Sequence, residues 1–88
     1  MNYEWLNNLY VIIRTETGIN SQLIFGHVLS FFEGFFTLEQ ACYLEFSSGQ
    51  VLATKMPGKL VYIQLPHVSE IIECEQEITD SVLKNFPK

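Results

Sequence analysis

Apolar residues recur along most of the chain at the spacing of β-strands. The segment 10–17 is rich in β-branched residues and predicts a first strand. A longer run over 22–46 also has β character, and its second half alternates between apolar and polar positions. Shorter runs over 51–56, 59–65 and 67–74 predict further strands. The chain is therefore expected to be mainly β, with about five short antiparallel strands.

Residues with turn chemistry divide these runs and predict sharp bends. Glycine inside a β run favours curvature, and proline interrupts a strand because it lacks a main-chain donor. The positions concerned are Gly26, Glu33, Gly34, Ser47–Gln50, Pro57, Gly58 and Pro66. Short, bent antiparallel strands of this kind close into small barrels.

The second half of the long run predicts a strand with one apolar and one wet face. The apolar face carries Leu38, Cys42, Leu44 and Phe46, and the other carries Glu39, Tyr43 and Glu45. Short helices are expected at the two ends of the chain, over 2–9 with Asn2 as N-cap and over about 75–85.

Length and composition fit one domain over residues 1–88, with a barrel over about 10–73 and the C-terminal helix over about 75–85. Hydrophobic residues make up 48% of the chain and aromatic residues 14%, which excludes a disordered polypeptide. The core of an 88-residue chain is marginal by itself. Oligomerisation is therefore expected to supply additional buried surface.

The charge balance limits the class of partner. Five Lys and Arg residues stand against ten Asp and Glu residues, which gives a net charge of −5. This excludes a protein that wraps duplex nucleic acid through many phosphate contacts, but it leaves single strands bound by base stacking. Lys55 and Lys59 flank a predicted turn and are candidates for phosphate contacts, with ordinary solvent-facing lysines as the alternative.

Neither a targeting segment nor a catalytic constellation is found in the sequence. The first ten residues lack a basic start and an apolar stretch of signal length, so a cytoplasmic protein without membrane contact is expected. Cys42 and Cys74 are then reduced thiols. No nucleophile–base set or metal-ligand spacing occurs, so no enzyme activity, cofactor or metal site is expected.

Two segments carry a specific order of residues. The first contains Phe25-Gly26-His27-Val28, then Phe32-Glu33-Gly34-Phe35-Phe36-Thr37-Leu38 and Ala41, and the second is Val61-Tyr62-Ile63-Gln64-Leu65-Pro66-His67-Val68-Ser69-Glu70-Ile71. In this order they resemble the first and second motifs of Sm-like (LSm) proteins, and Gly26-x-Val28-x-Ser30-Phe31 is similar to the bacterial Hfq branch of that family. The resemblance covers about residues 2–73.

The resemblance implies a strongly bent five-stranded antiparallel barrel behind an N-terminal helix. It also implies a homo-oligomeric ring of about five to seven subunits, joined edge to edge through 59–64 and 67–72. Phe35, Thr37 and Gln64 match the positions that hold a base of single-stranded RNA in the family, and Glu33 matches the acid that orients the loop. Thr37 replaces the family's Asn, and Gln64-Leu65 replaces Arg-Gly.

Three interpretations stay open at this point. The first is an Sm-like ring that binds single-stranded RNA by stacking and base-edge hydrogen bonds around the pore. The second is the same ring acting as a scaffold or protein-interaction module without RNA, which the net charge and the missing Arg favour. The third is an unrelated small barrel, monomeric or dimeric, that binds a protein partner. In each of them Phe35 has an ordinary alternative as a core residue.

Overall fold

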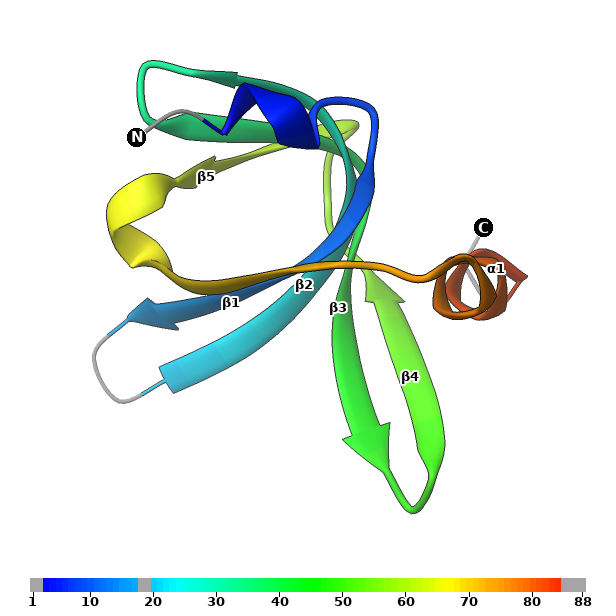
Figure 1. Cartoon of the computed structure of the whole chain (residues 1–88). Coiled ribbons are helices and arrows are strands. Elements are labelled where there is room, and N and C mark those ends of the chain that lie inside the picture. The colour runs from blue at the N-terminus through cyan, green and yellow to red at the C-terminus, as the bar shows by residue number, and fades with distance from the viewer. Residues whose placement is uncertain (1–2, 18–19, 85–88) are drawn as a thin grey trace.

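The computed structural model describes residues 3–17 and 20–84. Its strands form one antiparallel sheet that curls on itself (Figure 1). The strands are β1 (Tyr10–Thr17), β2 (Asn20–Phe32), β3 (Phe35–Ser47), β4 (Gln50–Lys55), β5 (Leu60–Gln64) and β6 (Val68–Glu73). The helical segments are the 3-10 turns η1 (Glu4–Leu6) and η2 (Leu65–His67) and the helix α1 (Gln76–Lys84). The mainly β character and the C-terminal helix are confirmed.

The strand order is β4-β3-β2-β1-β6, with β5 also paired to β3. β4 pairs with residues 42–47 of β3, and β5 pairs with residues 35–39 of the same strand. Because β5 and β6 do not pair with each other within the described residues, the sheet is open there, and the predicted closed barrel is wrong. The structure has six strands where about five were predicted, because the long run over 22–46 forms two strands, β2 and β3.

Among the described residues, two hairpin turns have positive φ at both central residues. Glu33 and Gly34 have φ of 50° and 81°, and Ser48 and Gly49 have φ of 50° and 77°. This combination matches the right-handed twist of paired strands, and glycine tolerates it at no steric cost. The predicted hairpin at 47–50 is confirmed. The expected bend at 33–34 is a complete reversal that separates β2 from β3.

A β-bulge in β3 overturns the predicted assignment of faces. Phe25 pairs with Cys42 and His27 pairs with Glu39, so Gln40 and Ala41 together face the single residue Gly26. Gln40 has a φ of 53°, as a bulge residue requires. An extra residue moves every later side chain to the opposite face. Leu38 and Cys42 therefore lie on opposite faces of the sheet rather than on one apolar face.

Both faces of the sheet are consequently buried at its centre. The inner face holds a core that includes Leu6, Val11, Ile13, Ile24, Val28, Phe36, Leu38, Ala41 and Ile63. The outer face holds a second core of Ile12, Phe25, Cys42, Leu44 and Val82. Val82 belongs to α1, so the C-terminal helix covers part of the outer face (Figure 1). Within the described residues, no helix is long and apolar enough to cross a lipid bilayer.

The predicted N-terminal helix is wrong. A single 3-10 turn over Glu4–Leu6 precedes β1, and no α-helix precedes it among residues 3–9. The reason is that the chain hydrogen-bonds to β2: the Asn8 amide donates to the Val28 carbonyl at 2.7 Å, and the Val28 amide donates to Leu9 at 2.9 Å. The expected cap Asn2 lies outside the described residues.

Burial of Cys42 makes the stability of the fold sensitive to alkaline pH. Desolvation raises the pKa of this thiol from its ordinary value of 9.0 to about 11. Between these values the unfolded chain loses a proton that the folded chain keeps, so the free energy of unfolding falls as pH rises. At pH 10 the loss from this group is on the order of 1 kcal/mol. Urea unfolding at pH 8 and pH 10 measures it, and Cys42→Ala is expected to lack this part of the pH dependence.

Candidate nucleic-acid interface

The pairing of β3 with β5 brings three of the sequence-predicted site residues together. Phe35 lies directly opposite Gln64, and Thr37 lies opposite Tyr62. Directly opposed residues of an antiparallel pair share a face of the sheet, with Cβ atoms about 4.5–5.5 Å apart. Phe35, Thr37 and Gln64 therefore form one continuous strip on the β3–β5 ladder, together with Tyr62.

This strip lies on the outer face of the sheet and is open to solvent. Phe35 keeps 38% of its surface exposed, whereas its neighbour Phe36 is completely buried. Tyr62 is 63% exposed beside the buried Ile63. The ordinary expectation that Phe35 is a core residue is therefore wrong for this face. An aromatic ring held by paired strands, with polar side chains beside it, is suited to stack a base and hydrogen-bond its edge.

Tyr62 was not predicted as a site residue. Its position in the strip depends on the register of β5 against β3, which the sequence does not specify. The signal that was present is the alternation in β5, where exposed Leu60, Tyr62 and Gln64 flank the less exposed Val61 and Ile63.

Glu33 occupies the hairpin turn beside the strip rather than the strip itself. Its side chain is exposed, and it makes no hydrogen bond or ion pair within the described residues. The polar link that fixes the turn is made by the main chain, because the Leu65 amide donates to the Gly34 carbonyl at 2.8 Å. This hydrogen bond holds the start of η2, directly after Gln64, against the β2–β3 turn.

The strip borders a hollow that also reaches residues of the inner core. Exposed Phe35, Tyr62, Gln64 and His67 contribute to its lining. Deeper residues, among them Ile24 and Ile63, supply apolar surface. The hollow therefore combines an aromatic ring, an amide and an imidazole next to the unpaired edge of β5.

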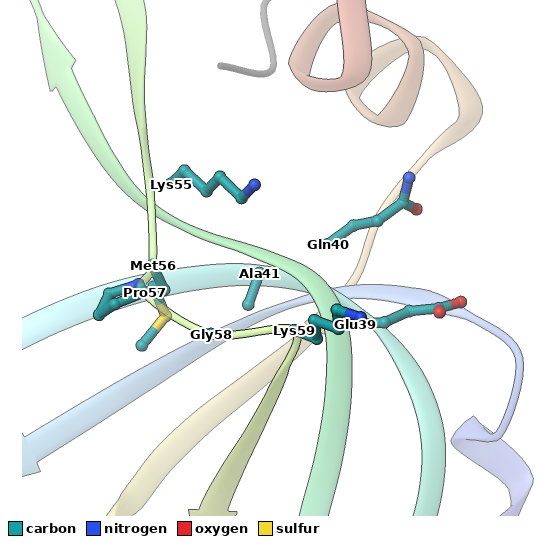
Figure 2. Close-up of a pocket in the computed structure, with 8 residues that line it drawn as sticks. All are labelled: Glu39, Gln40, Ala41, Lys55, Met56, Pro57, Gly58 and Lys59. Atoms are coloured by element: carbon teal, nitrogen blue, oxygen red, sulfur yellow. The ribbon is translucent and has the colours of Figure 1, made fainter. Parts of the chain in front are cut away.

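Lys55 and Lys59 line a separate groove beside the segment that connects β4 to β5 (Figure 2). Its other lining residues are Glu39, Gln40, Ala41, Met56, Pro57 and Gly58. Both lysines are exposed, and neither has a carboxylate partner within the described residues. The structure thus brings the two predicted basic residues to one groove, which is lined by the β3 bulge on one side and by the turn at 56–59 on the other.

The described residues contain no cluster of three His, Cys, Asp or Glu side chains that could hold a metal ion. Cys42 and Cys74 are free thiols, and burial raises the pKa of both; a hydrogen bond with Thr79 partly offsets the shift at Cys74. Comparison with protein-family models and with curated protein sequences finds no match.

Proposed function

We propose that this protein is an Sm-like subunit that forms a homo-oligomeric ring and binds single-stranded RNA. The observation that carries the proposal is the β3–β5 register. It gathers Phe35, Thr37 and Gln64 on one exposed strip, although they are separated by up to 29 positions in the sequence. These are the residues that the family resemblance matches to a base-binding site.

The topology supports the Sm-like part of the proposal. β4 and β5 lie one after the other along β3 and take the place of a single bent fourth strand. β6 then takes the place of a fifth strand and pairs with β1. η2 joins β5 to β6, and Figure 1 shows these two strands on opposite sides of the opening in the curled sheet.

The same strands support ring formation. β5 and β6 each have one strand partner within the described residues, so each offers an unpaired edge to another chain. Both carry apolar side chains that are exposed in the single subunit: Leu60 at 42%, Tyr62 at 63% and Ile72 at 46%. Pairing β5 of one subunit with β6 of the next satisfies both edges and closes a ring through one repeated contact.

Base recognition in this ring is expected to rest on stacking and on hydrogen bonds to the base edge. A base stacked on Phe35 gains about 1–3 kcal/mol, and the Thr37 hydroxyl and Gln64 amide offer donors and acceptors to its edge. The ring repeats the site in every subunit, so weak single contacts add through avidity. The proposal includes no enzyme activity and keeps the cytoplasm as compartment, because free thiols suit a reducing environment.

Native mass spectrometry on protein purified without nuclease tests both parts of the proposal. A closed oligomer of about five to seven subunits that carries nucleotide mass, and that binds added oligouridylate, is the expected result. A monomer or dimer would contradict the ring, and the RNA sites would fall with it.

The scaffold function is the second candidate, and two observations favour it. Gln64 lacks the charge and the stacking plane of a guanidinium. The acidic residues Glu70, Glu73, Glu75, Glu77 and Asp80 are all exposed. A ring of the expected size that binds no oligouridylate would select this alternative.

A further inference from the structure

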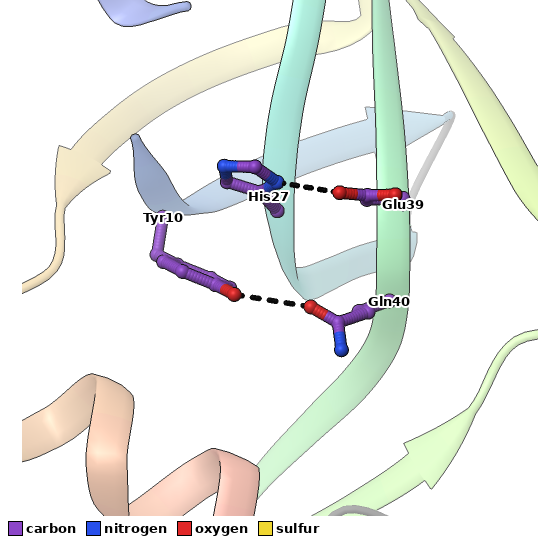
Figure 3. Close-up of polar contacts among 4 residues, drawn as sticks. All are labelled: Tyr10, His27, Glu39 and Gln40. Carbon is purple, nitrogen blue, oxygen red and sulfur yellow. Dashed lines mark hydrogen bonds and ion pairs between the residues drawn. The ribbon is translucent and has the colours of Figure 1, made fainter. Parts of the chain in front are cut away.

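The groove lined by Lys55 and Lys59 also contains the side-chain amide of Gln40, which was not predicted from the sequence as a site residue. The Tyr10 hydroxyl donates to Oε1 of Gln40 at 3.0 Å (Figure 3). This contact directs the amide oxygen toward Tyr10, and the amide nitrogen keeps its two N–H donors for another partner. Figure 2 shows Lys55 extending from the end of β4 in the direction of Gln40. Both side chains line the same groove.

The carboxylate in this groove is already engaged. Glu39 Oε1 lies 2.7 Å from Nδ1 of His27, and the Tyr10 ring stacks on the His27 ring with centroids 4.7 Å apart. One residue thus serves both contacts, since Tyr10 supports His27 with its ring and Gln40 with its hydroxyl (Figure 3). Glu39 directs one of its two oxygens to His27, and the side-chain donors that line the groove without a partner among the described residues are the two ammonium groups and the Gln40 amide nitrogen.

We propose that this groove binds a phosphate group of the RNA strand whose base stacks on Phe35, through Lys55, Lys59 and the Gln40 amide. The inference rests on the proposed function, and it adds a phosphate subsite to the base site. Charged donors together with an N–H group are the chemistry that recognises phosphate oxygens.

The path between the two subsites favours RNA as the source of the phosphate. Phe35 and Glu39 are four residues apart on the same face of β3, which corresponds to about 13 Å along the strand. Lys59 directly precedes Leu60, and Leu60 is the residue opposite Glu39. The base strip and the groove are therefore two parts of one continuous surface along the β3–β5 ladder.

The salt dependence of RNA binding tests the subsite. Binding of a labelled oligouridylate of about 12 nucleotides is measured by fluorescence anisotropy at several salt concentrations. The double variant Lys55→Gln/Lys59→Gln is expected to bind more weakly and to reduce the slope of log K against log salt. The reduction is about 0.7 for each lysine lost, or about 1.4 for each subunit that the strand contacts.

Two further variants separate the groove from general charge effects. Gln40→Glu can still accept the Tyr10 hydrogen bond but replaces the amide donor with a carboxylate, so it is expected to weaken binding. Lys84→Gln removes an exposed positive charge from α1, outside the groove, and is expected to leave the slope unchanged. Equal slopes for the wild type and the double variant would overturn the subsite and leave the proposed function standing.

Uridine monophosphate serves as a second probe and distinguishes the source of the phosphate. Its titration is followed by the NMR signals of the Gln40 side-chain amide, in the wild type and in Lys55→Gln/Lys59→Gln. A shift seen only in the wild type, in a protein that binds no oligouridylate, would overturn the proposed function and reassign the groove to a free nucleotide. No shift and no RNA binding would overturn both.

Discussion

Replacing Ile72 with lysine is expected to dissociate the proposed ring into monomers. Ile72 lies on β6, opposite Ile12 of β1, and 46% of its surface is exposed in the single subunit. In a ring joined through β5 and β6 this side chain lies at the contact, where a charged group loses water without gaining a partner. Lysine is also the residue with which natural sheets protect an edge from pairing.

Ring closure multiplies the effect of this substitution. If lysine weakens each contact by about 1 kcal/mol, a ring of about five to seven equivalent contacts loses about 5–7 kcal/mol in total. Analytical ultracentrifugation and native mass spectrometry measure the change in mass, while circular dichroism shows whether the subunit is still folded.

Ile78→Lys is the matched control for this experiment. Ile78 is exposed to a similar degree, 43%, but it lies on α1 and not on β5 or β6. This variant is expected to keep the oligomer. Loss of the oligomer in both variants, or in neither, would argue against assembly through the β6 edge.

The turns and most strands could be predicted because their signals are local. Glycine with positive φ marks the hairpin turns at 33–34 and 48–49, and β-branched residues mark β1. The bulge could not be predicted, because its left-handed residue is Gln40, an ordinary residue without a turn signature. Gly26 lies opposite the bulge on β2, and a Cβ added there would lie 3.0 Å from Cδ1 of Leu38. The sequence thus shows a close approach there but not which strand takes the extra residue.

Some residues of the candidate site could likewise be predicted from the sequence, and others could not. Phe35, Thr37 and Gln64 were assigned through two short motifs, and the register then places them on one strip. Tyr62 and Gln40 were missed because their roles arise from contacts between distant segments, such as the Tyr10–Gln40 hydrogen bond across 30 positions. Motif order thus pointed to the proposed base site, whereas the proposed phosphate groove could be recognised only in the fold.

The adjacent residues Phe35 and Phe36 are expected to separate RNA binding from stability. Phe36 is completely buried, and its ring lies 5.6 Å from Tyr3 and 4.7 Å from Phe31 between centroids. Phe36→Ala is expected to lower the free energy of unfolding by about 3–5 kcal/mol, because it leaves a cavity in the inner core. That is a large part of the roughly 5–15 kcal/mol that stabilises a small domain.

Phe35→Ala is expected to weaken RNA binding and to have a much smaller effect on stability. The ring is partly exposed on the outer strip, so its removal changes the free energy of unfolding far less than removal of Phe36. Loss of base stacking costs about 1–3 kcal/mol per base, which corresponds to about 5- to 140-fold weaker binding at each site. Urea unfolding and oligouridylate anisotropy on both variants measure the two effects. If Phe35→Ala binds RNA like the wild type, the base is not held on this strip, even if the ring itself proves correct.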